Sequence, residues 1–149
     1  MRMAPVGLVA NDPFRLGCEL ATHPDHAEVE EALSAAVAAA AIGRPSPEAV
    51  ERLGMGWVAE EALAIAVYCA LAHQDDFAAG VRLAVNHGGD SDSTGAIAGN
   101  ILGALLGVEA IPACWLEGLE LREEIMAVAD DLLTGYRDTD EWRLRYPGW

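Results

Sequence analysis

Residues 87–107 read HGGDSDSTGAIAGNILGALLG. The first part of this stretch is a polar loop, and the second part is apolar. Glycine recurs there at every fourth position (95, 99, 103 and 107), so the glycines share one face of a predicted helix over about 94–106. Each glycine costs an exposed helix roughly 1 kcal/mol against alanine. We therefore expect this helix to pack tightly in the core, which offsets that cost, and to fix the polar loop before it.

The remaining sequence also predicts helices. Alanine is frequent, β-branched runs are scarce, and apolar residues recur at three- and four-residue spacing. The predicted helices cover about 4–10, 13–21, 26–42, 47–54, 57–72, 77–86, 94–106 and 116–133, followed by a polar tail. The helix over 57–72 is apolar around much of its circumference, which predicts a central position. We expect a single all-α domain over residues 1–149, a compact multi-helix bundle. Apolar helical sequence already begins at Met3, before the first predicted helix and without a capping residue, which predicts an incomplete bundle.

The charge balance argues against two classes of partner. The chain has 24 acidic and 9 basic residues, a formal net charge of -15, and its arginines are scattered along the sequence. A nucleic-acid-binding surface needs clustered Lys and Arg, and so does attraction to an anionic lipid surface. The most apolar later stretch, 96–106, is too short to cross a bilayer. We expect a soluble protein that binds neither nucleic acid nor membrane.

The cysteines indicate a reducing compartment. Cys18, Cys69 and Cys114 are odd in number, far apart in the sequence, and each lies in an apolar helical context. This pattern favours buried, reduced thiols. The first ten residues contain no long apolar core followed by a small-residue cleavage site, so no secretory signal is predicted. A cytoplasmic protein is expected.

The polar loop carries the donor set of a hard cation. Asp90 and Asp92 alternate, so both carboxylates are expected to project to one side, and Ser93 or Thr94 adds a neutral oxygen. Such oxygens suit Mg²⁺, Mn²⁺ or Ca²⁺, whereas Zn²⁺ prefers nitrogen and sulfur. The two glycines before them permit backbone angles that a side chain would forbid, and they let a ligand approach the main chain closely. A metal site is the favoured interpretation.

Two other interpretations of this loop remain to be weighed. Asp90 or Asp92 alone can cap the following helix, although capping explains only one of the two carboxylates. An EF-hand loop would begin at Asp90, but its twelfth position, where a bidentate Glu is required, is Ile101. Capping therefore stays open, and the EF-hand is excluded.

Two other kinds of site are disfavoured. A cysteine hydrolase built on Cys18 or Cys69 lacks an adjacent oxyanion motif, and both cysteines lie inside predicted helices. A zinc pair of His23 and His26 is disfavoured because Pro24 breaks the helical spacing that such a pair needs.

Several segments together resemble a known family. NHGGDSDSTGAIAGNILGALLG (86–107), IPACWLEGLELREEI (111–125) and the closing RYPGW resemble the C-terminal half of the ADP-ribosylglycohydrolases, the family of dinitrogenase-reductase-activating glycohydrolase. MRMAPVGL at the start resembles the central helix of that family, and THPD (22–25) resembles the Thr-His segment after it. The resemblance covers residues 1–149.

The resemblance implies an all-α fold that holds two Mg²⁺ or Mn²⁺ ions. By position, Asp90 and Asp92 resemble metal ligands of the family. Ser93 stands where the family commonly has a ligating Thr, and it keeps the hydroxyl. The ions would bind and orient ADP-ribose.

The resemblance also implies the reaction. Water would cleave the bond between the anomeric carbon of ribose and a modified side chain, through an oxocarbenium-like state. His23 matches the family's histidine near ADP-ribose. Together with Gly88 and Gly89 it is the expected substrate contact. A turn histidine half packed on the surface is the alternative interpretation of His23.

Several motifs of the family are absent from this sequence. The family's N-terminal half supplies a Thr-Asp-Asp metal motif, an acidic catalytic residue and a Gly-rich phosphate loop, so no catalytic residue is assigned here. The pair Glu60-Glu61 is acidic, but nothing in the sequence places it beside the ions. Two carboxylates and one hydroxyl form only part of the coordination of two octahedral cations. We expect weak metal binding and, because apolar helix faces would be left uncovered, a homo-oligomer or a complementary N-terminal fragment.

Two functions follow from these observations. The first is a metal-dependent hydrolase that removes ADP-ribose from a modified protein or small molecule, with this chain carrying the C-terminal half of the site. The alternative is a noncatalytic module that binds metal or ADP-ribose, or has a structural, crystallin-like role.

Overall fold

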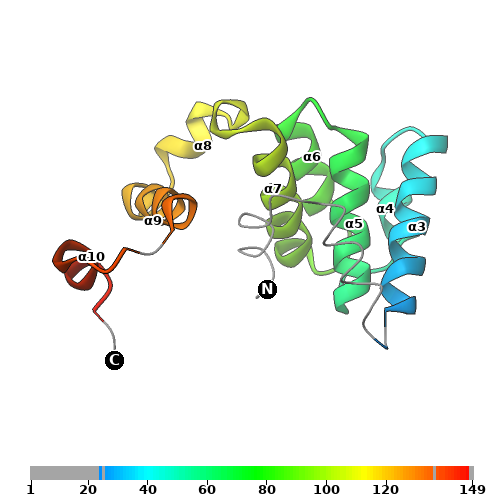
Figure 1. Ribbon diagram of the computed structural model, residues 1–149. Coiled ribbons are helices and arrows are strands. Elements are labelled where there is room, and N and C mark those ends of the chain that lie inside the picture. The colour runs from blue at the N-terminus through cyan, green and yellow to red at the C-terminus, as the bar shows by residue number, and fades with distance from the viewer. Residues whose placement is uncertain (1–23, 25, 136, 148–149) are drawn as a thin grey trace.

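The computed structural model describes residues 24, 26–135 and 137–147 (Figure 1). Within these residues the chain forms eight α-helices and one 3-10 helix, and no β-strand. This confirms the predicted all-α fold. The helices predicted over 4–10 and 13–21, together with Cys18 and His23, lie outside the described residues. The elements are α3 (Ala27–Ile42), α4 (Pro47–Glu51), α5 (Ala59–Ala72), α6 (Phe77–Val85), α7 (Ser91–Leu106), η1 (Val108–Ala110), α8 (Ala113–Glu117), α9 (Arg122–Thr134) and α10 (Asp140–Arg145).

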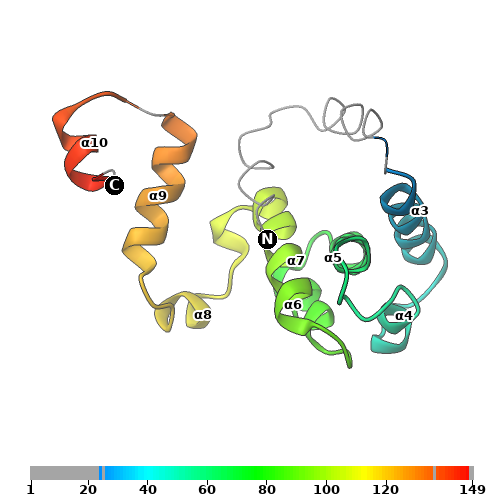
Figure 2. The same ribbon diagram turned by 90° about the horizontal axis from the view of Figure 1, so that it is seen from below.

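Helix α5 occupies the centre of the bundle. It packs against α3 on one side and against α6 and α7 on the other, and α6 also packs against α7. Figure 2 shows this arrangement, with α3 and α4 together on one flank of α5. Ile65, Tyr68 and Cys69 on α5 are almost completely buried. The central position predicted for this helix is therefore correct.

Small side chains make up much of the core. Alanines contributed by α3, α5, α6 and α7 are almost completely buried, namely Ala36, Ala64, Ala66, Ala84 and Ala98. Because alanine projects only a methyl group, facing helices can approach closely where it lines the contact. Phe77 and Leu102 form a second cluster together with Ala70, near the C-terminal end of α5.

Two helices begin where capping residues predict. The Ser46 hydroxyl accepts a hydrogen bond from Ala49 N at 3.3 Å at the start of α4, and Pro47 occupies the first helical position. The Asp76 carboxylate accepts one from Ala79 N at 2.9 Å at the start of α6. The side chains of the polar turns before α4 and α6 therefore cap these helices.

The C-terminal region differs from its prediction. The acidic helix expected over 116–133 is two helices, α8 and α9, separated at residues 118–121, where Leu121 adopts a left-handed conformation (φ 56°). The predicted polar tail contains α10, whose start is capped by the Thr139 hydroxyl, an acceptor for Trp142 N at 3.4 Å. Cys114 on α8 is exposed, so the expectation of a buried thiol is wrong there.

The glycine face of α7 lies against α6. A Cβ added to the glycines would meet Val85 Cγ1 at 2.5 Å from Gly95, Val81 Cγ2 at 4.0 Å from Gly99 and Phe77 Cε2 at 3.9 Å from Gly103. Gly107 (φ 79°) ends the helix. The glycine pattern predicts that the whole face packs too tightly for a methyl group. Among the three glycines that face α6, only Gly95 packs that tightly.

This difference predicts that alanine substitutions at Gly99 and Gly95 have different effects on the free energy of unfolding. Gly99→Ala should raise the free energy of unfolding by up to about 1 kcal/mol, since a methyl group fits there and alanine favours the helix. Gly95→Ala should give no such gain, because Val85 must move. Urea denaturation of both variants checks this. Equal gains at the two positions would contradict the packing described here.

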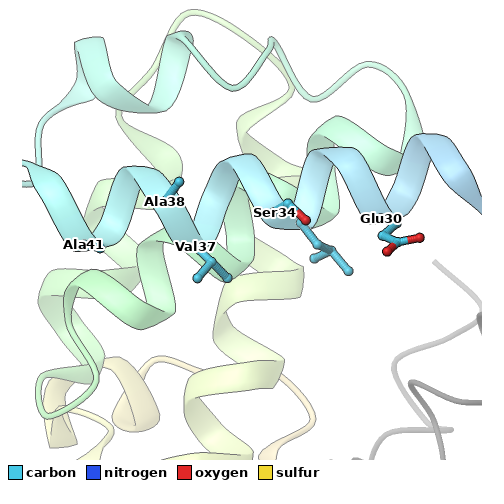
Figure 3. A pocket seen from close by; sticks show the side chains of 6 residues that line it. Glu30, Ser34, Val37, Ala38 and Ala41 are labelled. Atoms are coloured by element: carbon cyan, nitrogen blue, oxygen red, sulfur yellow. The ribbon is translucent and has the colours of Figure 1, made fainter.

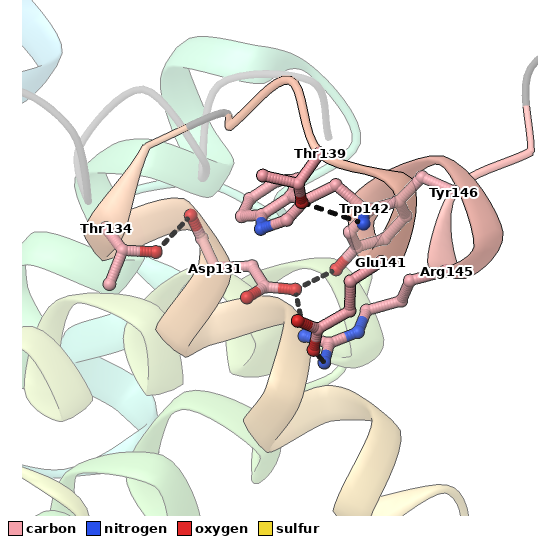
Figure 4. A network of polar contacts seen from close by, with 7 residues as sticks. All are labelled: Asp131, Thr134, Thr139, Glu141, Trp142, Arg145 and Tyr146. Carbon is pink, nitrogen blue, oxygen red and sulfur yellow. Dashed lines mark hydrogen bonds and ion pairs between the residues drawn. The ribbon is translucent and has the colours of Figure 1, made fainter.

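Helices α9 and α10 lie apart from the bundle in both views (Figures 1 and 2) and are joined to each other by a polar network (Figure 4). Arg145 donates to Asp131 at 2.6 Å and to Glu141 at 3.1 Å, and the Tyr146 hydroxyl donates to Asp131 at 2.9 Å. The pKa of Asp131 lies below its ordinary value, chiefly because the Arg145 guanidinium hydrogen-bonds to it and secondarily because Tyr146 does. Asp131 is thus the shared acceptor between the two helices.

Acid should separate α10 from α9. Because the folded-state pKa of Asp131 is lowered, its contribution to the contact is complete above the unfolded value and is lost as the pH falls through the folded value. An NMR titration following the Asp131 carboxyl and the Trp142 indole should show both changing together, at a pH below that at which an ordinary aspartate titrates. Asp131→Asn should show the released Trp142 signal at neutral pH. An unchanged Trp142 signal in that variant would contradict the role of Asp131.

Apolar side chains remain exposed on several helices. On α3, Val37 is 53% exposed and Ile42 is 86% exposed, and Trp57 before α5 is 70% exposed. An open groove runs along α3, lined by Glu30, Leu33, Ser34, Val37, Ala38 and Ala41 (Figure 3). None of the helices in the described ranges is long and apolar enough to cross a membrane.

Because these apolar side chains are exposed, we still expect the chain to associate with a further copy of itself or with a second polypeptide. At micromolar concentration the purified chain should show a mass above that of a monomer, or carry a second polypeptide, because burying such side chains is favourable. Light scattering gives the mass, and mass spectrometry identifies any second chain. A monodisperse monomer without a companion would refute the prediction.

Candidate functional site

The start of α7 brings together the predicted metal ligands. The helix begins at Ser91, earlier than the predicted start near residue 94, because Asp90 caps it. One Asp90 carboxylate oxygen accepts a hydrogen bond from Ser93 N at 3.4 Å. Asp92 and Ser93 therefore lie in the first helical turn, and the alternating projection expected of an extended loop is replaced by helical geometry.

The three residues share the N-terminus of α7, Asp90 as its N-cap and Asp92 and Ser93 in its first turn. The pKa of Asp90 lies below its ordinary value, first because the Ser93 side chain hydrogen-bonds to its carboxylate. The Ser93 backbone N–H lowers it further. Asp90 and Ser93 are half-buried, and Asp92 is exposed. The arrangement thus presents two carboxylates and one hydroxyl near the surface.

Asp90 also performs the capping role that stayed open as an alternative. Its contact with Ser93 N is that of a helix N-cap. The contact engages Oδ1 of Asp90, so capping and cation binding can share this carboxylate.

Thr94 belongs to the interior rather than to the ligand set. Its side chain is completely buried, and its hydroxyl donates to the carbonyl oxygen of Ala84 at 2.7 Å. The same hydroxyl lies 2.9 Å from His87 Nε2. Of the two hydroxyls considered as neutral ligands, only Ser93 is therefore available.

His87 orders the loop before α7. Its Nδ1 accepts a hydrogen bond from Gly89 N at 3.1 Å, which leaves Nε2 to carry the proton and donate to Thr94 Oγ1. This neutral tautomer satisfies all three groups at once. Sequence analysis gave His87 no role, and its position beside the glycine pair was the available signal.

The two glycines act differently from their prediction. Neither Gly88 nor Gly89 has a positive φ, so neither is needed for a left-handed conformation. A Cβ on Gly89 would lie 1.8 Å from the carbonyl oxygen of Met55, so the space beside Gly89 is filled by another backbone segment. Gly88 is exposed, and its N–H donates to the Glu51 carboxylate at 3.2 Å.

A segment before α5 supports the loop. The carbonyl oxygen of Met55 accepts from Asp90 N at 2.8 Å. Glu61 Oε2 in turn accepts from Met55 N and Gly56 N, both at 3.0 Å. Sequence analysis missed this support. The signal available was Gly54-Met55-Gly56 ahead of the acidic pair Glu60-Glu61.

The structure also bears on the other residues that the sequence analysis considered as site residues. Burial raises the pKa of the Cys69 thiol to about 12, which agrees with rejecting it as a nucleophile. His23, the expected substrate contact, lies outside the described residues. Within the described part of the chain, no cluster of three or more His, Cys, Asp or Glu is arranged to hold a metal ion. The oxygen set at the start of α7 is thus a partial one.

Comparison with known proteins identifies relatives of this chain. ADP-ribosyl-[dinitrogen reductase] glycohydrolase of Rhodospirillum rubrum is 44% identical over 61 residues, which are 40% of this chain and 21% of that protein. An ADP-ribosylarginine hydrolase of Serratia proteamaculans is 43% identical over 58 residues, 39% of this chain and 16% of that protein. An uncharacterized protein of Archaeoglobus fulgidus is 44% identical over 84 residues, 56% of this chain and 27% of that protein.

The aligned parts are short relative to these proteins. The chain spans between 16% and 27% of the length of the three relatives. No solved structure matches it. The family model for ADP-ribosylglycohydrolase matches residues 19–141, a range that includes α3 to α9 and the whole of the polar loop. By this match the chain belongs to the ADP-ribosylglycohydrolase family.

Proposed function

We propose that this chain forms part of a metal-dependent hydrolase that removes ADP-ribose from a modified protein or small molecule. The observation that carries the proposal is the grouping of Asp90, Asp92 and Ser93 at the start of α7, in a member of the ADP-ribosylglycohydrolase family. The three residues are the proposed ligands of Mg²⁺ or Mn²⁺. His23, Gly88 and Gly89 are the proposed contacts to ADP-ribose.

The chemistry of the donor set fits a hard divalent cation. Carboxylate and hydroxyl oxygens suit Mg²⁺ and Mn²⁺, and water can complete an octahedral shell. Two adjacent carboxylates repel each other, so a bound cation would relieve that repulsion. A cation also reverses the local sign of a chain with net charge -15, which favours an anionic ligand such as ADP-ribose.

The residues of this chain would bind and orient rather than complete the reaction. When bound, the metal supplies charge that orients ribose hydroxyls or phosphate. The N-terminus of α7 adds backbone N–H groups of favourable polarity for an anion. Cleavage through an oxocarbenium-like state needs a carboxylate that activates water, and Glu61 is unsuited to this because two backbone amides occupy its oxygen.

The names of the relatives guide the choice of substrate. One is named for removal of ADP-ribose from dinitrogen reductase, and another for hydrolysis of ADP-ribosylarginine. We propose an ADP-ribosylated protein as the first substrate to test. Since the chain spans a small part of these relatives, the proposed catalytic unit includes either a complementary N-terminal fragment or a further copy of this chain.

Metal binding is the most direct test. Calorimetry with Mn²⁺ should give weak binding to the wild-type chain, which Asp92→Ala abolishes. Asp90→Asn should also abolish it while preserving the helix, since asparagine caps as well as aspartate. Asp76→Asn is the matched control, because Asp76 caps α6 in the same way but has no carboxylate two positions later. Binding that survives in Asp90→Asn and Asp92→Ala would refute the proposed ligands.

Turnover is tested with the complete catalytic unit. ADP-ribosylated protein should lose its modification with Mg²⁺ or Mn²⁺, and Asp92→Ala should prevent this. If the substrate stays intact with the wild-type protein, the hydrolase proposal fails.

The noncatalytic alternative keeps one observation in its favour, namely that Asp90 already serves the helix as its cap. Binding of Mn²⁺ or ADP-ribose without turnover would support a binding module. Binding of neither would leave a structural role.

A further inference from the structure

We infer that Glu61 is a positioning residue, which sets the backbone of the Asp90 loop through residues 54–56. The part of this inference that concerns metal binding rests on the proposed function. The part that concerns the position of the loop rests on the geometry alone. Glu61 lies in the first turn of α5. It accepts a hydrogen bond from Met55 N, and the Met55 carbonyl oxygen in turn accepts one from Asp90 N, so Met55 connects Glu61 to Asp90.

Residues 54–56 wrap around the Glu61 carboxylate. One oxygen, Oε2, accepts from both Met55 N and Gly56 N at 3.0 Å. Gly54 and Gly56 have φ values of 127° and 76°, conformations that side chains rarely adopt. A Cβ on Gly54 would lie 2.5 Å from the carboxyl carbon of Glu61. The turn is therefore shaped around this carboxylate, and two charge-assisted hydrogen bonds hold it.

Residues 54–56 also contact the loop that contains Asp90. Met55 offers its carbonyl oxygen to Asp90 N at 2.8 Å. Gly89 lies so close to that carbonyl group that no side chain fits. A Cβ on Gly56 would lie 2.9 Å from Thr94 Cγ2. A shift of residues 54–56 would therefore move the first residues of α7 as well.

Glu61 acts through the backbone and not on the ligand itself. Without its carboxylate, the N–H groups of Met55 and Gly56 lose their acceptor, and the turn that presents the Met55 carbonyl is released. Residues that orient metal ligands in this way commonly change affinity by 10- to 100-fold. Glu60 provides the matched comparison, since it has the same charge and lies in the same first turn of α5.

The first experiment follows the Asp90 amide in the metal-free chain. Hydrogen exchange by NMR should be about tenfold faster at Asp90 in Glu61→Ala than in wild type, with amides of the α5 core unchanged. Glu60→Ala should exchange as wild type does. Glu61→Gln should restore slow exchange, because its amide oxygen can accept from both N–H groups. Equal exchange at Asp90 in Glu61→Ala and Glu60→Ala would overturn the inference, whether or not the chain binds metal.

The second experiment measures Mn²⁺ affinity of the same variants by electron paramagnetic resonance. Glu61→Ala should weaken binding by about tenfold, and Glu61→Gln and Glu60→Ala should stay close to wild type. Leu102→Ala removes a buried side chain at the far end of α7 and controls for general loss of stability. If it weakens Mn²⁺ binding as much as Glu61→Ala does, a specific role for Glu61 is refuted. If wild type binds no Mn²⁺, the proposed metal site fails, and hydrogen exchange alone decides the role of Glu61.

Discussion

The hydrogen bond from Asp90 N to the Met55 carbonyl oxygen is the constraint on which the candidate site depends. It joins the turn before α5 to the loop before α7, and it lies where Gly89 allows the two backbones to approach closely. His87 adds a second restraint by bridging Gly89 and Thr94. Because these contacts involve backbone atoms and buried groups, the start of α7 is fixed before any ligand binds. Preorganisation of this kind lowers the cost of gathering like charges.

The central helix explains why these two segments meet. α5 contacts α3, α6 and α7, so the turn that leads into α5 lies beside the loop that leads into α7. Alanine-rich contacts bring the helices close, and the buried Thr94 ties the first turn of α7 to the end of α6 through Ala84. The acidic side chains at the start of α7 are thereby held at the surface by an apolar framework.

Local sequence signals predicted most of the bundle. The starts of α4 and α6 lie next to their capping residues, Ser46 and Asp76, so the chain itself carries a local signal for both. The start of α7 was placed too late, since serine and aspartate favour caps and turns as much as helix interiors. The break between α8 and α9 has a local signal in Gly118, which ends α8, whereas the left-handed conformation of Leu121 depends on its surroundings.

Within the candidate site, Asp90, Asp92 and Ser93 were chosen as predicted metal ligands from their type and spacing alone, and that role stays a prediction. The roles of Glu61 and Met55 were not predictable, because they depend on contacts between segments far apart in the sequence. Thr94 was considered beside Ser93 as a source of a neutral oxygen because of its hydroxyl, whereas its burial follows from helix packing.

The junction between Met55 and Gly89 has a consequence for how this family member can vary. Met55 contributes its carbonyl group to the junction, while its side chain is 38% exposed. Gly89 contributes the absence of a side chain. The junction therefore requires only the backbone N–H and carbonyl groups of residue 55, whereas any side chain at position 89 would collide with that carbonyl group.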